Sequence, residues 1–483
     1  MREDIFASYL QKLTGEDCSA SSPAGGELMF DLAVCGGKVV IPDGGVLETD
    51  VYVRDGRIAL LGSGGSLPAQ RTIDARGKYV LPGIIDPHSH MGLFVPLEED
   101  LASETMSAVM GGVTTIGCFL GGQQSHLETF PAIADKVARF SYVDMIPHLV
   151  IGNEQQKSEM RLYMDRFGIR SFKLYMNGIP GMIPDVDDGF VLDVFDEIKK
   201  SGYHCPVCVH AENRDLVRRA TRIGRDRNPQ AAVEDYSDTH PVMAEEEAVM
   251  RMSYLAEKSG VPVYFVHITS ADAVRRLEAI KNQNRLVHVE TTSMYLSVCR
   301  TDERGRNEFK MDPPFRDEKD VEALWQALAD GVIDTVGTDN TTITRAEKRA
   351  DGNMWEAIPG YPAEETHLPA LLSEGVIRRG LPLEKLITHI TKKPAQIFGV
   401  YPQKGTLLPG SDADMVIVDL NKSVTVQAKD LHSRSDFSVF EGRELTGWPV
   451  ATIKNGRILA ENGRFLAPAP EGKLLLDFSP LSK

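Results

Sequence analysis

The stretch Pro82-Gly-Ile-Ile-Asp-Pro-His-Ser-His90 decides the fold, because an apolar, strand-like run ends there in two histidines. Side chains alternate between the two faces of a β-strand, so the imidazoles of His88 and His90 point to the same side. Two neutral imidazole nitrogens can bind one cation, and they suit zinc and similar metals. The stretch therefore predicts a strand that supplies two metal ligands.

Seven more apolar runs follow along the chain, with helix-length amphipathic stretches between them. This alternation is typical of buried parallel strands covered by helices. The eight expected strands lie near residues 80–90, 113–120, 142–151, 171–176, 207–211, 261–269, 286–292 and 335–339. Eight such repeats can close an α/β barrel of the TIM type, (β/α)8, whose active site lies at the carboxyl ends of the strands.

Short alternating segments with turn residues between them flank the barrel region on both sides. Asp43-Gly-Gly45 interrupts them before the barrel, and Asn455-Gly456, a hairpin-turn signal, interrupts them after it. We expect both chain ends to form one small β-sandwich. The predicted domains are an N-terminal extension (1–29), the first part of the sandwich (30–80), the barrel (81–400), and the second part of the sandwich with a C-terminal tail (401–483).

Four other polar residues end expected strands of the barrel: Lys173, His210, His267 and Asp339. A single histidine at the end of a buried strand is usually a packed core residue, but strand ends meet at one mouth of a barrel. Together with His88 and His90 they predict a two-metal hydrolytic site, because catalytic sites keep one coordination position open for water. The remaining histidines lack this pattern and are expected at the surface or in packing: His126, His148, His204, His240, His288, His367, His389 and His432.

Lys173 is the odd member of the set, because an ammonium ion cannot bind a cation and is costly to bury. Burial lowers the pKa of a lysine, and the neutral amine can capture carbon dioxide to give a carbamate. This N6-carboxylysine has two oxygens able to bridge two metals. From the residues alone, a buried lysine paired with an Asp or Glu is an equally good interpretation.

Asp339 ends the last expected strand, in Val336-Gly-Thr-Asp339. A carboxylate there can bind one metal and also accept a proton from the attacking water. A structural salt bridge is the alternative, but the position at the mouth of the barrel favours catalysis.

Composition excludes several classes of partner. The net charge of −16 would repel a phosphate backbone and an anionic membrane surface, so we expect neither nucleic acid nor membrane as a partner. The start of the chain has no apolar signal core, and no run of about 18 apolar residues occurs, which predicts a cytoplasmic protein. Cys205 and Cys208 imitate a metal or redox pair but are expected to pack.

Across residues 30–467 the chain resembles the amidohydrolase superfamily, and within it the dihydropyrimidinase and hydantoinase type of cyclic-amide hydrolase. The matching motifs are Pro82-Gly-Ile-Ile-Asp-Pro-His-Ser-His90, Phe172-Lys-Leu-Tyr-Met176, His210-Ala-Glu-Asn213, Val266-His-Ile-Thr269, Glu290-Thr-Thr-Ser-Met-Tyr-Leu296, Pro313-Pro-Phe-Arg316 and Val336-Gly-Thr-Asp339. The resemblance implies two divalent metals, zinc first and manganese as the alternative. It places His88, His90 and Asp339 on one metal, His210 and His267 on the other, and carboxylated Lys173 between them.

The same resemblance implies a small-molecule substrate and a homo-oligomer. The substrate is a cyclic amide, ureide or imide, which the family holds through main-chain groups; the matching positions here are Ser293 and the loop that contains Pro359 and Gly360. Asn340 also borders the substrate in this comparison. Relatives are often tetramers, so a homotetramer is expected.

Two departures from the family pattern lie beside the metal ligands. The family has a tyrosine that polarises the substrate carbonyl five residues after the bridging lysine, where this chain has Gly178. Tyr175, on the strand face of Lys173, is the expected stand-in, because losing an oxyanion donor costs about a hundredfold in rate. Asn340 replaces a histidine that commonly follows the aspartate. Met91 follows the first histidine pair where dihydroorotase-like enzymes have arginine, which disfavours a carboxylated substrate.

Two other functions stay open from the sequence. An amidohydrolase of this kind could act on an acyclic N-acyl amide or a lactam. A dihydropyrimidinase-related protein could also be a non-catalytic assembly protein, although such relatives lack the ligands and this chain retains all six.

Overall fold

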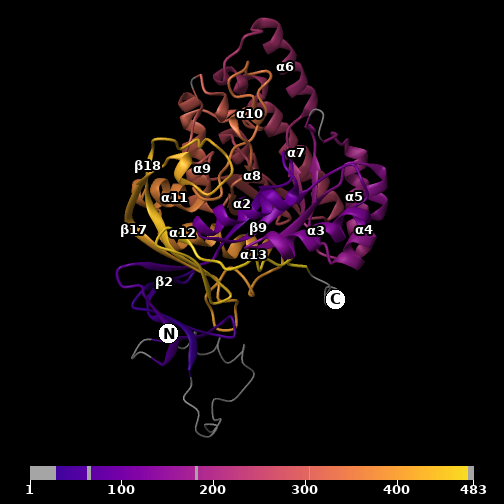
Figure 1. Ribbon diagram of the computed structural model, residues 1–483. Coiled ribbons are helices and arrows are strands. Elements are labelled where there is room, and N and C mark those ends of the chain that lie inside the picture. Colours follow the sequence, from indigo (N-terminus) through magenta and orange to yellow (C-terminus); the bar gives the residue numbers. More distant parts are fainter. Residues whose placement is uncertain (1–28, 63–66, 180–182, 304, 477–483) are drawn as a thin grey trace.

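The computed structural model describes residues 29–62, 67–179, 183–303 and 305–476. Figure 1 shows α3, α4 and α5 on one side of the barrel and the long strands β17 and β18 on the other. The predicted N-terminal extension lies outside the described residues except for Met29.

The largest sheet is parallel and forms the barrel. Its strands are β8 (Ile84–His90), β9 (Val113–Leu120), β10 (Asp144–Val150), β11 (Phe172–Tyr175), β12 (Val207–His210), β13 (Val263–Phe265), β14 (Val287–Thr292), β15 (Thr335–Gly337) and β16 (Asn340–Thr341). They follow one another in the order β15-β14-β13-β12-β11-β10-β9-β8-β16. Only Thr338 and Asp339 separate β15 from β16, so these two act as one interrupted strand, and β16 closes the barrel on β8. The predicted (β/α)8 fold class is confirmed.

Helices cover the outside of the barrel because its strands are buried on both faces; every residue of β9 and β10 is buried. The barrel helices are α2 (Leu97–Met110), α3 (His126–Phe140), α4 (Glu154–Phe167), α5 (Asp188–Ser201), α6 (Arg214–Arg227), α7 (Val242–Ser259), α8 (Ala271–Lys281) and α9 (Glu318–Asp330). Local sequence sets their ends. For α4, the side chain of Asn153 accepts the N–H of Gln156 at the start, and left-handed Gly168 ends the helix.

Short helices fill the loops and lead out of the barrel. They are η1 (Val233–Thr239), η2 (Arg300–Glu303), η3 (Asn307–Phe309), α10 (Arg345–Lys348), α11 (His367–Leu371), the π-helix η4 (Leu372–Arg378), α12 (Leu383–His389), α13 (Lys392–Ile397) and η5 (Ala428–Asp430). The helices α6 and α10 lie at the end of the molecule away from the N-terminal strands (Figure 1).

Both chain ends build the β-sandwich, as predicted. The first sheet, in the order β5-β4-β1-β6, and the second, in the order β20-β19-β18-β17-β7-β2-β3, share an apolar core. The strands are β1 (Phe30–Cys35), β2 (Lys38–Ile41), β3 (Gly45–Glu48), β4 (Asp50–Arg54), β5 (Arg57–Gly62), β6 (Ala69–Asp74), β7 (Tyr79–Pro82), β17 (Met415–Thr425), β18 (Glu444–Lys454), β19 (Arg457–Glu461) and β20 (Arg464–Phe465).

The single strand predicted over residues 80–90 is two strands. The first part, β7, pairs with β2 and β17 in the sandwich, whereas β8 pairs with β9 and β16 in the barrel. Gly83 joins them at a point with no room for a side chain, since a Cβ there would lie 2.2 Å from the Thr114 hydroxyl oxygen. The strand that carries His88 and His90 is therefore anchored directly in the sandwich.

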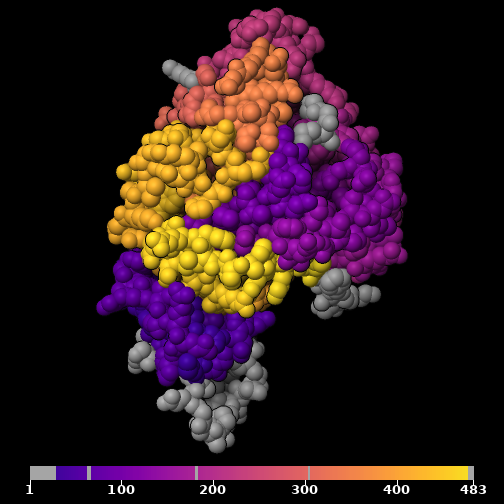
Figure 2. Space-filling view, in the orientation of Figure 1, coloured from indigo at the N-terminus to yellow at the C-terminus, as the bar shows by residue number. Residues whose placement is uncertain are grey.

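A buried ion cluster ties the sandwich to the base of the barrel. The ammonium of Lys404 lies 2.6 Å from Asp144 at the start of β10, and 3.0 and 2.7 Å from Asp412 and Asp414 just before β17. Asp144 also pairs with Lys454 of β18 at 2.8 Å. Figure 2 shows the C-terminal segment, in yellow, between the indigo N-terminal strands and the barrel. None of the helices in the described ranges combines the length and hydrophobicity needed to span a membrane.

Candidate metal centre

The structure brings the six predicted ligands to the carboxyl end of the barrel. His88 and His90 end β8, Lys173 lies in β11, and His210 ends β12. His267 follows β13, and Asp339 lies in the break between β15 and β16. His90 is partly exposed, and the other five side chains are buried.

The first group of ligands is His88, His90 and Asp339. Asp339 Oδ1 lies 3.0 Å from His88 Nε2 and 3.2 Å from His90 Nε2. One nitrogen or oxygen atom from each residue falls within 4.8 Å of the other two, which is close enough to hold a metal ion. Burial raises the pKa of Asp339, but the neighbouring His88 outweighs it, so this carboxyl keeps a pKa well below its ordinary value.

The second pair, His210 and His267, lies beside the first group. The ring centroids of the pair are 4.5 Å apart, and the ring of His267 stacks on that of His88 at 5.5 Å. Four imidazoles thus share one mouth of the barrel. The role of His210 and His267 as ligands of a second metal stays a prediction.

Lys173 is completely buried and has neither a hydrogen-bond partner nor an ion pair within the described residues. Its Nζ lies over aromatic rings, 4.4 Å from the centroid of Phe119 and 4.9 Å from that of Tyr175. Burial lowers the pKa of its amine to about 8. The alternative of a lysine paired with an Asp or Glu is therefore not observed. A buried, unpaired amine fits carbamate formation.

Two of the six residues have unusual backbone conformations. His267 has a φ of 44° and Asp339 a φ of 55°, in the left-handed region that non-glycine residues seldom adopt. Such conformations cluster at functional sites, where the surrounding structure holds them in place. Here the N–H of His267 donates to Glu290 Oε1 at 3.0 Å, and the N–H of Asp339 donates to the carbonyl of His88 at 2.8 Å.

Glu290 is a site residue to which the sequence analysis assigned no role. Its Oε1 lies 2.7 Å from His88 Nδ1, and its Oε2 accepts the hydroxyl of Tyr264 at 2.7 Å. Burial lowers the pKa of His88, but Asp339 and Glu290 together raise it to about 9. Because Glu290 holds Nδ1, the Nε2 of His88 is left to face the metal site. Glu290 is the first residue of the motif Glu290–Leu296, within β14, and this motif was the sequence signal that it matters.

Glu212 plays the corresponding part for His210. Its Oε2 lies 3.0 Å from His210 Nε2 and accepts Asn177 Nδ2 at 3.1 Å, and its Oε1 lies 3.0 Å from His240 Nδ1. His240, expected at the surface or in packing, is buried in this network and reaches Asp312 at 3.4 Å. In the sequence, only the occurrence of His210 and Glu212 in one motif pointed to a role for Glu212.

The predicted substrate contacts lie around the same mouth, and several of their polar groups already have partners. The hydroxyl of Ser293 lies 3.0 Å from His367 Nδ1, and its N–H donates to a barrel carbonyl, that of Gly337, at 3.0 Å. Asn340 Oδ1 accepts the N–H of Ala363 at 2.8 Å, which ties the 358–363 loop to β16.

The remaining two contacts are in this loop. The N–H of Gly360 donates to the carbonyl of Lys310 at 3.1 Å, and its carbonyl accepts the ammonium of Lys348 at 2.6 Å. Pro359 is partly buried beside it. The structure thus shows a loop held firmly against the mouth.

Gly178 cannot carry the family tyrosine in this backbone. Its φ is +66°, and a Cβ there would lie 2.7 Å from the nitrogen of Asp185 and 2.8 Å from the carbonyl oxygen of Ile183. Tyr175 is buried with its ring stacked on His210 at 5.7 Å. Its hydroxyl makes no hydrogen bond to another described residue.

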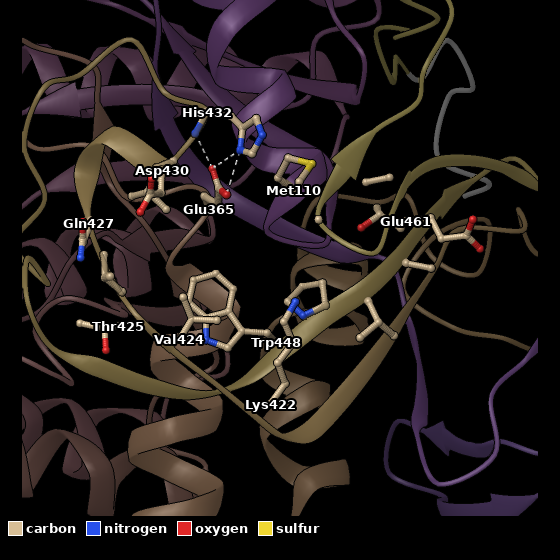
Figure 3. Close-up of a pocket in the computed structure, with 18 residues that line it drawn as sticks. Met110, Glu365, Lys422, Val424, Thr425, Gln427, Asp430, His432, Trp448 and Glu461 are labelled. Carbon is tan, nitrogen blue, oxygen red and sulfur yellow. Dashed lines mark hydrogen bonds and ion pairs between the residues drawn. The ribbon is translucent and has the colours of Figure 1, made fainter.

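A separate cavity of about 160 Å³ opens between the end of α2 and strands β17 and β18 (Figure 3). Met110, Trp448, Glu365 and His432 are among its lining residues. His432 Nδ1 lies 3.1 Å from Glu365 Oε1, and this contact raises the pKa of His432. None of the six predicted ligands lines this cavity, so it is distinct from the metal centre.

The sequence profile of the amidohydrolase family matches residues 79–459, from β7 to β19. The chain belongs to the amidohydrolase family. Among curated amidohydrolase relatives, the L-hydantoinase of Paenarthrobacter aurescens is 32% identical over 92% of this chain and 98% of its own. The D-hydantoinase of Ralstonia pickettii is 31% identical with the same coverage.

Solved amidohydrolase structures agree with this assignment. The dihydropyrimidinase of Brevibacillus agri superimposes with a TM-score of 0.85 at 27% identity, over 92% of this chain and 98% of that one. The likeness spans both the barrel and the sandwich.

Proposed function

We propose that this amidohydrolase is a metal-dependent hydrolase that opens a cyclic amide, such as a hydantoin, a dihydropyrimidine or a cyclic imide. One observation carries the proposal: a buried, unpaired lysine amine lies among four imidazoles and a carboxylate at the mouth of a barrel. The relatives named hydantoinase and dihydropyrimidinase support the choice of a cyclic amide.

The donor set fits two divalent cations, with zinc as the first choice and manganese as the alternative. In the proposed arrangement His88, His90 and Asp339 would hold one cation, and His210 and His267 would hold the other. Lys173, once carboxylated at its amine by carbon dioxide, would supply carbamate oxygens as further ligands. The missing partner of Lys173 Nζ supports this role, because a buried polar group is normally paired.

When bound, the cations supply Lewis acidity, which polarises the substrate carbonyl and lowers the pKa of water towards neutrality. Asp339 then takes the proton of the attacking water and returns it to the leaving ring nitrogen. Its low pKa keeps it ionised at neutral pH, as a base must be. The ring opens at the amide bond, and no protein side chain forms a covalent bond to the substrate.

Tyr175 is proposed as the donor to the carbonyl oxygen that becomes negatively charged. Its place beside Lys173 and His210 supports this role, as does the lack of a hydrogen bond from its hydroxyl to any other described residue. Ser293, Asn340, Pro359 and Gly360 are proposed to border the substrate, with main-chain groups making the contacts where they are available. The resemblance also supports a homotetramer, which light scattering can check.

A substrate panel and metal analysis test the function together. Purified protein should contain about two metals per chain and should open at least one of hydantoin, dihydrouracil, allantoin and a cyclic imide. Protein with two metals that hydrolyses only an N-acyl amino acid or a lactam would refute ring opening of these substrates. Protein without metal or turnover after incubation with zinc and bicarbonate would point to an assembly role.

A further inference from the structure

Asp86 is a buried carboxyl group of the first barrel strand that has no cation to pair with. It lies in β8, two residues before His88, and its side chain is fully buried. Among the described residues no lysine or arginine forms a salt bridge with it, and another carboxyl group, that of Glu364, lies beside it. A buried carboxyl group normally lies next to a cation, so its hydrogen bonds must indicate its role.

The hydrogen bonds of Asp86 connect two segments that carry proposed metal ligands. Its Oδ1 accepts the N–H of His88 at 3.1 Å and the N–H of Thr338 at 2.9 Å. Its Oδ2 accepts the hydroxyl of Thr338 at 2.6 Å. Thr338 directly precedes Asp339 in the break between β15 and β16. One side chain thus joins the first strand of the barrel to the last, where the barrel closes.

Thr338 extends this connection to both sides of Asp339. Its hydroxyl oxygen also lies 2.9 Å from the carbonyl oxygen of His88 and accepts the N–H of Asn340 at 2.9 Å. The N–H of Asp339 donates to the same carbonyl of His88 at 2.8 Å. These bonds fix the backbone before and after Asp339, and Asp86 anchors them. They can therefore hold Asp339 in its left-handed conformation, with a φ of 55°.

The strand pairing itself does not hold this break. The ladder between β16 and β8 begins only at Asn340, which pairs with Ser89. Just before the break, Gly337 packs directly on His88, because a Cβ there would lie 2.9 Å from the Cβ of His88. The distance of 3.0 Å between His88 Nε2 and Asp339 Oδ1 thus depends on side-chain bonds across the break.

The second pair of ligands does not share this arrangement. His210 ends β12 and His267 follows β13, and among the described residues neither forms a hydrogen bond with Asp86. Glu290 differs in this respect, because it contacts both His88 and His267. Asp86 therefore acts on one half of the centre only.

We propose that Asp86, acting through Thr338, is a positioning residue for the first metal alone, because it sets Asp339 against His88. The inference rests on the proposed function, since it needs two metals. Asp86 touches neither metal nor substrate in this proposal. Loss of its bonds should weaken the cation held by the first group of ligands and leave the cation of the second pair in place.

Thr338→Val tests the proposal because it keeps the shape of the side chain and removes the donor to Asp86 Oδ2. In zinc titrations against a chelator, we expect one of the two zinc ions to bind about tenfold more weakly or worse, while the other keeps its wild-type affinity. The kcat should fall about tenfold or more at nearly constant KM, since a small displacement of the base lowers the rate without altering substrate contacts. Thr338→Ser keeps the hydroxyl and should restore both values.

Thr452→Val is the matched control. Its buried hydroxyl donates to the carbonyl of Val109 at 2.7 Å in the sandwich, far from the ligands in the chain. This variant should lose stability without a change in the affinity of either zinc ion.

Background variants identify which zinc ion is affected. In His210→Ala, which lacks a ligand of the second metal, Thr338→Val should weaken the zinc ion that remains. In His90→Ala it should have no further effect. Asp86→Asn keeps an oxygen for the two N–H groups but cannot accept the hydroxyl, so it should match Thr338→Val. The double variant should be no weaker than either single variant, because both remove the same bond.

Unchanged affinity for both zinc ions in Thr338→Val would overturn the positioning role while ring opening stands. An equal loss of both zinc ions that follows a lower melting temperature, as a general structural defect would give, would also overturn it. A wild-type protein that neither binds two zinc ions nor opens a cyclic amide would overturn the proposed function as well.

Discussion

Glu290 orients His88 through a contact of 2.7 Å between Oε1 and Nδ1, and the same carboxylate oxygen accepts the N–H of His267. One side chain thus positions a ligand from each of the two proposed metals. Glu290 therefore contacts residues of both proposed metal sites. A variant at this position tests whether the two metals bind independently.

Glu290→Gln keeps the shape of this side chain and removes its charge. We expect metal affinity to fall about 10- to 100-fold, because loss of a residue that hydrogen-bonds to a metal ligand usually lowers the affinity by that much. Chelator competition with purified protein measures it. Glu257→Gln, at an exposed position of α7, is the control. Wild-type affinity in Glu290→Gln would show that His88 is oriented without this carboxylate.

Asp339→Asn should keep metal bound but lower kcat by about a hundredfold or more, since an amide cannot accept the proton of the attacking water. Metal analysis and steady-state kinetics on the same preparation separate the two effects. Asp330→Asn, exposed at the end of α9, should behave as wild type. Full turnover in Asp339→Asn would contradict the assignment of Asp339 as the base.

Lys173 predicts a pH dependence for assembly of the site. Its pKa is lowered from 10.5 to about 8, and only the neutral amine captures carbon dioxide. The neutral fraction is roughly a tenth at pH 7 and nine-tenths at pH 9. In protein stripped of metal and carbon dioxide, recovery of metal binding with zinc and bicarbonate should become faster across this range. A rate independent of pH would contradict carboxylation as the limiting step.

Lys173→Ala supplies the control for that experiment. It should lose the two-metal site at every pH, and a short-chain carboxylate should restore part of it by replacing the carbamate oxygens. Wild-type metal content in the untreated variant would count against a bridging role for Lys173.

Tyr175→Phe should lower kcat by about a hundredfold with little change in KM, because the lost donor serves charge that forms in the transition state. Kinetics on the best substrate of the panel test this, with Tyr254→Phe as control. Activity equal to wild type would mean that another group replaces the tyrosine missing at Gly178.

Lys404→Met should destabilise the fold by about 3–5 kcal/mol, since it takes the shared ammonium from three buried carboxylates, of which Asp144 keeps Lys454. Denaturant unfolding measures the free energy. Lys429→Met, at an exposed position, removes the same charge and should change stability little. A variant as stable as wild type would show that Asp144, Asp412 and Asp414 do not depend on this ammonium.

The barrel could be predicted from the sequence because continuous apolar runs mark strands buried on both faces. The candidate ligands could be predicted because several histidines rarely end neighbouring buried strands without a shared function. The break at Gly83 could not be predicted, because the apolar pattern runs through it unchanged. Which sheet each half joins depends on partners far along the chain. The domain boundaries near residues 80 and 400 remain predictions.

The residues that orient the proposed metal ligands were harder to predict from the sequence. Glu290 and His88 are 202 residues apart, and no local pattern links a carboxylate to the ring it orients. Glu212 lies only two residues from His210, in the same motif. The motif marked Glu212 as a residue of interest, but the spacing did not show that its carboxylate contacts the imidazole of His210. Asn340 shows the opposite case: its position beside Asp339 indicated substrate contact, and the structure also gives its side chain a partner in Ala363.

The junction at Gly83 also bears on biosynthesis. The strand β7, which runs directly into the first histidine pair, pairs with β17, whose residues are synthesised more than three hundred positions later. The sheet that anchors this pair is therefore completed only after residues 415–418 have been synthesised. Pairing between such distant segments forms slowly. The anchor of His88 and His90 thus forms after all the barrel strands, β8 to β16, which lie between β7 and β17 in the chain, have been made.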